Sequence, residues 1–119
     1  MGLDMYLSVQ DGTEFKEIGY WRKSNAIHYW FVNTLANGVD ECQEIKVTHE
    51  DLCKLLDLCN VIKNNHEIAE ELLPTRSGFF FGNTSYNEGY FSDIDETIKI
   101  LTDVITLYPD SEFVYQASW

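Results

Sequence analysis

The feature that most constrains the fold is a run of apolar residues at helical spacing between Thr48 and Lys63. Residues that recur every three or four positions lie on one face of a helix. The members of this stripe are Leu52, Leu55, Leu56, Cys59 and Ile62. Thr48 supplies an N-cap hydroxyl, and Glu50 and Asp51 suit the positive end of the helix dipole. A helix with one apolar face needs a second apolar layer to pack against.

A second helix is predicted over 24–38. Ser24 or Asn25 can serve as its N-cap, and Asn37 with Gly38 suits a left-handed end. Its main apolar stripe consists of Ile27, Trp30, Phe31 and Leu35. A second set of apolar residues predicts that this helix is covered on more than one side.

A third helix is predicted over 92–109, with Ser92 or Asp93 as its N-cap and Pro109 as its stop. The apolar stripe of this helix consists of Ile94, Ile98, Leu101, Ile105 and Tyr108. A short helical continuation is also expected over 66–73, where Pro74 ends it.

Four stretches are typical of strands because they alternate or concentrate apolar residues between turn signals. They are 3–9, 42–47, 79–81 and 112–119. Residues 14–19 are polar enough for a loop or a short edge element. The expected order is β-α-β-α-β-α-β in a single domain, 1–119. We therefore expect an α+β fold with a four-stranded mixed sheet and about three helices mostly on one face.

The charge is strongly negative, with 20 acids against 8 bases and a net charge of −12. Residues 67–119 carry 10 acids and 2 bases, so the second half is the more acidic. Such a field repels phosphate backbones, which argues against direct binding of nucleic acid. It suits a partner with a basic surface, and the alternative is an ordinary solvated acidic face.

Three cysteines, Cys42, Cys53 and Cys59, cannot all pair with one another. No secretory leader and no apolar stretch long enough to span a membrane is expected. The sequence therefore favours a cytoplasmic protein with free thiols and no contact with a membrane.

The stretch Trp21-Arg22-Lys23 offers the clearest candidate binding groups. Two bases beside an indole at the start of a helix can hold a carboxylate or a phosphate. The alternative is that Arg22 and Lys23 pair with nearby acids such as Glu17. His28, one turn into the helix, can act as an acid, a base or a hydrogen-bond donor, or simply be a paired core residue. Arg76 would complete a small cationic pocket if its loop folds beside Arg22.

Other chemistry lacks a signature in this sequence. The three histidines have no metal-binding spacing, and no nucleophile motif or phosphate-cradling glycine loop is present. We therefore expect no catalytic residue, no metal and no cofactor, and the residues favour a non-enzymatic protein.

Five segments, spread along the whole chain, together resemble the sequences of a family of small bacteriophage and prophage proteins. They are Gly2-Leu3-Asp4-Met5-Tyr6-Leu7, 20–28, 72–75, 78–82 and Tyr115-Gln116-Ala117-Ser118-Trp119. The resemblance implies phage origin and action in the host cytoplasm. It supplies no catalytic residue.

Two functions follow as hypotheses. In the first, a phage accessory protein binds and inhibits a host or defence protein, as anti-CRISPR inhibitors do. Its acidic surface, which includes Glu88, Asp93, Asp95 and Glu96, would face a basic groove that otherwise holds nucleic acid. In the alternative, the protein binds a small phosphorylated or nucleotide-like ligand, as a sponge or a small enzyme. That ligand would contact Trp21, Arg22, His28 and Arg76. Exposed edge strands also leave a homodimer open.

Overall fold

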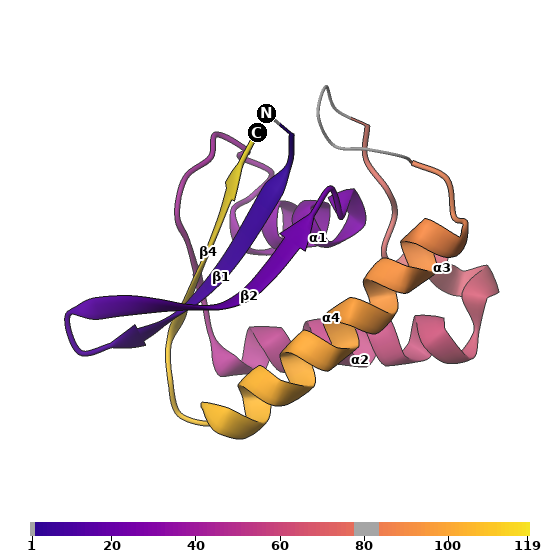
Figure 1. Cartoon of the computed structure of the whole chain (residues 1–119). Helices are drawn as coiled ribbons and strands as arrows, with labels where there is room; N and C mark the ends of the chain where they lie inside the picture. Colours follow the sequence, from indigo (N-terminus) through magenta and orange to yellow (C-terminus); the bar gives the residue numbers. More distant parts are fainter. Residues whose placement is uncertain (1, 78–83) are drawn as a thin grey trace.

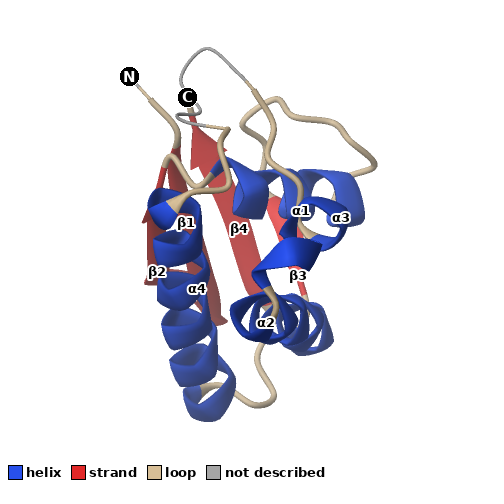
Figure 2. Ribbon diagram, turned by 90° about the vertical axis from the view of Figure 1, so that its right-hand side faces the viewer, coloured by secondary structure: helices blue, strands red, loops and turns tan. Residues whose placement is uncertain are grey.

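The computed structural model describes residues 2–77 and 84–119, which form two layers (Figure 1). One layer is a four-stranded sheet, and the helices cover one face of it (Figure 2). The strands are β1 (Asp4–Asp11), β2 (Glu14–Arg22), β3 (Ile45–Val47) and β4 (Phe113–Ser118). The helices are α1 (Asn25–Leu35), α2 (His49–Asn64), α3 (Ala69–Leu72) and α4 (Glu88–Leu107), with a 3-10 turn, η1 (His66–Ile68), before α3. The expected α+β class is confirmed.

The sheet is antiparallel throughout, which corrects the expectation of a mixed sheet. Its order is β2-β1-β4-β3, and every neighbouring pair runs antiparallel. The chain turns at Gly12, whose φ of 65° suits a tight turn, and returns at once as β2. The last strand, β4, then lies between β1 and β3, so the two ends of the described chain meet in the centre of the sheet.

Strand β2 adds a strand to the expected order of elements, because the stretch expected to be a loop or a short edge element is a full edge strand. Residues 14–17 are exposed, and the hairpin that they form with β1 extends beyond the helices (Figure 1). A strand that projects into solvent has no buried face, so the alternation that normally identifies strands is missing there. The predicted strand at 79–81 lies outside the described residues.

The core lies between the sheet and the helices. The sheet contributes Met5, Leu7 and Val9 from β1, Ile45 and Val47 from β3, and Phe113, Tyr115 and Ala117 from β4. The predicted stripe of α2 faces these residues, with Leu52, Leu55, Cys59 and Ile62 at 0% exposure. The stripe that most constrained the sequence therefore provides the second layer.

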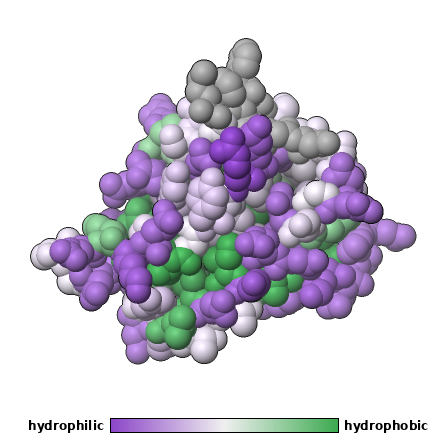
Figure 3. Space-filling view, viewed as in Figure 1, coloured by the Kyte–Doolittle hydropathy of each residue, from purple (hydrophilic) through white to green (hydrophobic). Residues whose placement is uncertain are grey.

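Helix α4 packs closely on β2 at Gly19. A side chain there would bring its Cβ within 3.0 Å of Ile100 Cγ2, so glycine permits the approach. Figure 3 shows a group of apolar side chains near the middle of the face seen in Figure 1, which is otherwise mainly hydrophilic. Leu107, near the end of α4, is 70% exposed.

Two helix starts test the predicted caps. Thr48 caps α2, and its side chain and that of Asp51 form a reciprocal capping box, as the sequence indicated. Helix α4 begins earlier than predicted, at Glu88, because Asn87 is its N-cap. The Asn87 Oδ1 accepts hydrogen bonds from the amides of Gly89 and Tyr90 at 3.0 and 3.4 Å. Ser92 and Asp93 are therefore inside the helix.

Strand β3 is shorter than the predicted strand 42–47. Cys42 has a φ of 59°, which is incompatible with an extended strand, and the ladder begins only at Ile45. Asn37 and Gly38 after α1 have φ values of 53° and 81°, which confirms the predicted left-handed end.

Candidate functional site

The chain turns sharply between β2 and α1. Arg22 ends the strand, Lys23 has a φ of 55°, and Ser24 is the N-cap of the helix. The Lys23 amide donates a 2.7 Å hydrogen bond to the carbonyl of Leu3, which ties the turn to the start of β1. A lysine in the left-handed region is held there only by surrounding structure. These residues therefore form a fixed corner.

An open pocket of about 220 Å³ lies at this corner, between the start of α1 and the first turns of α4. Its polar wall includes Arg22, Lys23, Ser24, Asn25, Thr75 and Asp93. The pocket thus combines two bases, several neutral hydrogen-bonding groups and one acid. Two of the five predicted ligand-binding residues, Arg22 and Lys23, line it.

One wall of the pocket is held in place by hydrogen bonds to neighbouring elements. The Thr75 amide donates to the hydroxyl of Tyr86 at 3.0 Å, and Thr75 Oγ1 donates to the carbonyl of Thr84 at 2.8 Å. The Arg76 amide donates to Asn25 Oδ1 at 3.1 Å. Asn25, considered as a cap in the sequence, instead anchors this segment to the first turn of α1.

Ser24 has an unusual combination of burial and missing hydrogen bonds. The residue is 2% exposed, and its Oγ has no hydrogen-bond partner within residues 2–77 and 84–119. It makes no side-chain cap bond, although it occupies the N-cap position of α1. A buried hydroxyl without a partner is uncommon, because its desolvation is not compensated. Ser24 is one of the residues that line the pocket, and its hydroxyl is closed to solvent in this conformation.

Arg22 and Lys23, the two bases of the pocket, differ in their contacts with acidic groups. Arg22 is paired with Asp4 through a 2.9 Å contact, with its side chain 53% exposed. The hydroxyl of Tyr20, and then Arg22, lower the pKa of Asp4. The Lys23 ammonium makes no hydrogen bond or ion pair in the described part of the chain. Glu17, suggested as a partner for both bases, pairs with neither within the described residues.

Asp93 is the acid of the pocket and is half-buried on the second turn of α4. Burial raises the pKa of its carboxyl to about 6, while the nearby Ser24 hydroxyl opposes the shift and Glu96 adds to it. Ser24 therefore lies close enough to act on this carboxyl without meeting the geometry of a full hydrogen bond.

Trp21 connects two of the elements that form the pocket. Its side chain is 3% exposed, and Nε1 donates a 2.9 Å hydrogen bond to Thr97 Oγ1. Thr97 in turn donates to the carbonyl of Asp93 at 2.7 Å. The indole thus joins the end of β2 to the turn of α4 that carries Asp93, and it does not line the pocket.

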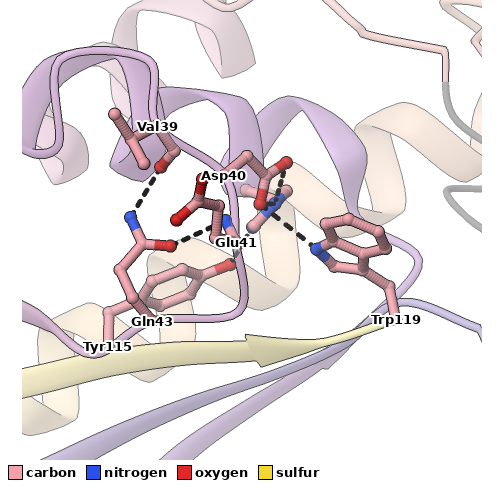
Figure 4. A network of polar contacts seen from close by, with 7 residues as sticks. Val39, Asp40, Glu41, Gln43, Tyr115 and Trp119 are labelled. Carbon is pink, nitrogen blue, oxygen red and sulfur yellow. Dashed lines mark hydrogen bonds and ion pairs between the residues drawn. The ribbon is translucent and has the colours of Figure 1, made fainter.

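His28 belongs to a separate buried network (Figure 4). Its Nδ1 lies 2.6 Å from the hydroxyl of Tyr115, and its Nε2 lies 3.0 Å from both oxygens of Asp40. Trp119 Nε1 donates to the same carboxylate at 3.2 Å. The network joins α1, the loop after it and the end of β4. Burial lowers the pKa of His28, Asp40 opposes this shift, and Arg76 adds to it.

Arg76 does not line the same pocket as Arg22. Its guanidinium lies over the ring of Tyr29, 5.1 Å from the centroid, which is a cation–π geometry. The cationic pair predicted from Arg22 and Arg76 is therefore replaced by Arg22 and Lys23. This difference arises from the turn at Lys23, whose left-handed backbone conformation is not predicted by any sequence pattern.

The four acids predicted as a partner surface separate in the structure. Glu88, Asp95 and Glu96 are exposed on α4, and Asp95 lies 3.8 Å from Lys63. Asp93 faces the pocket instead. From the sequence, Ser24 and Asp93 are expected only as helix caps, and Asp93 also as part of the acidic partner surface. Asp40 was not identified at all, because a single acid in a loop carries no pattern.

Residues 2–77 and 84–119 contain no group of three or more histidines, cysteines or acids placed to hold a metal ion. Among the same residues, no helix combines the length and apolar character needed to cross a bilayer.

Comparisons with protein-family models, with curated proteins and with solved structures found no match for this chain. The resemblance to phage proteins therefore stays a prediction. The pocket is the feature of the molecule that bears most directly on its function.

Proposed function

We propose that the protein binds a small phosphate-bearing anion in the pocket at the start of α1. The observation that carries the proposal is the buried Ser24 hydroxyl, which has no partner in the described chain and lies beside two bases. This corresponds to the alternative function suggested by the sequence, with Ser24 and Lys23 in place of Trp21, His28 and Arg76.

Three features of the pocket suit a phosphate group. The first amides of α1 lie at the positive end of the helix dipole, and Ser24 leaves them without a side-chain cap. Lys23 supplies a positive charge with no partner in the described chain, and Arg22 has donors beyond the one used by Asp4. A phosphate oxygen that accepts from Ser24 would also satisfy its buried hydroxyl.

Isothermal titration calorimetry with inorganic phosphate and with a small phosphate monoester tests the proposal. We expect saturable binding that weakens about tenfold in Lys23→Gln, because a charge-assisted hydrogen bond is worth about 1.5–3 kcal/mol. Lys16→Gln is the matched control, since it removes the same charge from the exposed hairpin at the other end of β2. The absence of saturable binding to the wild type would contradict the proposal.

A second candidate is the inhibitor function, in which a phage-encoded protein occupies a basic, nucleic-acid-binding groove of a host or defence protein. The exposure of Glu88, Asp95 and Glu96 along α4, in a chain of net charge −12, favours it. Such a complex should weaken steeply with salt. The test compares capture of a partner from infected-cell lysate by the wild type and by a variant with these three acids replaced by glutamine. Equal capture at low and high salt would count against this function.

A further inference from the structure

Asp93 is the one acidic side chain among the described residues that line the pocket. Its carboxyl is half-buried beside Ser24, and the same pocket contains Arg22 and Lys23. A carboxylate at this place repels an anion that can only accept hydrogen bonds, whereas it attracts an anion that still carries a proton. The charge of Asp93 therefore affects which anions can bind, whereas the two bases attract any anion.

Resting on the proposed function, we propose that Asp93 makes the pocket selective for anions that carry a P–O–H group over fully ionised sulfate. Phosphate monoesters lose their last proton with a pKa of about 6, and inorganic phosphate keeps at least one proton throughout the neutral range, so a P–O–H group is present near pH 7. That proton can be shared with the Asp93 carboxyl, while the remaining oxygens accept from Ser24, Lys23 and Arg22. Sulfate has no proton to share at this pH.

The protonation of Asp93 itself sets the pH dependence. Burial raises its pKa to about 6, so below this pH the neutral carboxyl can donate a hydrogen bond to sulfate as well. Among the charged groups, Glu96 on its own helix acts on this carboxyl, and Arg22 and Lys23 line the same pocket. Tyr90 also lines the pocket, and burial raises its pKa further above the neutral range, so it stays uncharged.

Calorimetric titration of the 119-residue chain with potassium phosphate and potassium sulfate, at constant ionic strength, tests the inference. At pH 7 we expect phosphate to bind at least about tenfold more tightly than sulfate, in line with the effect of one unpaired buried charge. At pH 5 the ratio should fall toward one as sulfate binding appears. In Asp93→Asn the amide can donate to either anion, so the two affinities should agree within about threefold at every pH.

Two matched variants separate selectivity from binding. Ser24→Ala should weaken phosphate and sulfate by the same factor and leave their ratio unchanged. Asp103→Asn, which removes an exposed charge from the same helix outside the pocket, should change neither affinity by more than about twofold.

The possible outcomes are distinct. If the wild type binds phosphate and sulfate equally at pH 7, or if Asp93→Asn keeps the preference, the inference is overturned while the proposed function stands. If the wild type binds neither anion, the proposed function fails and the inference fails with it. Should Asp93→Asn not fold, the pH dependence of the phosphate-to-sulfate ratio in the wild type decides, and a constant ratio overturns the inference.

Discussion

Ser24 and His28 lie one turn apart on α1, and their surroundings differ in how completely buried polar groups are paired. Both residues are 2% exposed. Both ring nitrogens of His28 have partners, Tyr115 and Asp40, within 3.0 Å. The Ser24 hydroxyl has no partner in the described chain. Completed polar networks stabilise a fold, whereas an unpartnered buried group is uncommon and, in our proposal, is completed by a bound anion.

The two regions also respond to pH in opposite directions. Burial lowers the pKa of His28, so its stabilising contribution is present above its ordinary pKa of 6.5 and is lost as the pH falls. Burial raises the pKa of Asp93 to about 6 from 3.8, so the native state favours the protonated acid. The pocket is therefore destabilised as the pH rises through 6, whereas the histidine network is most stable above pH 6.5.

The largest expected effect comes from breaking the completed network. His28→Ala leaves the hydroxyl of Tyr115 and the carboxylate of Asp40 without their partner in the core, so the free energy of unfolding should fall by about 3 kcal/mol. Urea denaturation at pH 7.5 measures it. The phosphate affinity of the folded variant should stay within about twofold. A loss below about 1 kcal/mol would mean that the network contributes little to stability.

Asp93→Asn sharpens the pH comparison. The raised pKa makes the wild type less stable as the pH rises from 4 to 7, and the isosteric amide should remove this slope. At pH 7.5 the variant should be more stable by about 1–2 kcal/mol, a value reduced for solvent screening of a half-exposed group. Thermal unfolding between pH 4 and 7.5 measures the slope. Asp103→Asn, at an exposed acid farther along α4, is the control, and parallel curves for wild type and Asp93→Asn would refute the prediction.

Ser24→Ala should separate binding from stability. Because Ser24 makes no cap bond, its loss should change the free energy of unfolding by no more than about 0.5 kcal/mol, while phosphate affinity falls about fivefold to tenfold. Thr48→Ala provides the contrast, because Thr48 is a cap that is bonded. It should cost about 1 kcal/mol and leave phosphate affinity unchanged. A similar loss of stability in both variants would show that Ser24 acts as an ordinary cap.

The smallest expected effect concerns the rim of the network. Trp119 is 44% exposed and donates to Asp40 at 3.2 Å. Trp119→Phe keeps an aromatic ring and removes the donor, so the free energy of unfolding should fall by about 0.5 kcal/mol. The decrease is measurable by urea denaturation, and a decrease as large as that of His28→Ala would show that Trp119 is central to the network.

The parts of the fold that were predictable are those in which burial imposes a period. The stripe of α2 and the alternation of β1 each reveal a buried face, and the Thr48 cap follows from local chemistry. Strand β2 escaped prediction because residues 14–17 are exposed on both sides. The antiparallel order depends on the position of β4 between β1 and β3, which is a long-range pairing without a local signal.

The candidate site was predictable only in part. Arg22 and Lys23 were identified because bases are rare in this chain, at 8 of 119 residues. The role of Ser24 depends on a missing hydrogen bond, and that of Asp93 on the burial of one acid among 20. Neither the missing hydrogen bond of Ser24 nor the burial of Asp93 can be predicted from the type of residue. Both arise from the way α4 packs against the start of α1.

The most direct test of the central claim is a titration of the ¹⁵N-labelled protein with inorganic phosphate, followed by the amide resonances in NMR spectra. The account predicts saturable shifts concentrated at the first amides of α1, residues 25–27, and at Lys23 and Asp93. The amides of His28 and Asp40 should shift far less, because that network is already complete. Shifts that are absent, or that spread over exposed lysines such as Lys54 and Lys99 without saturating, would contradict it.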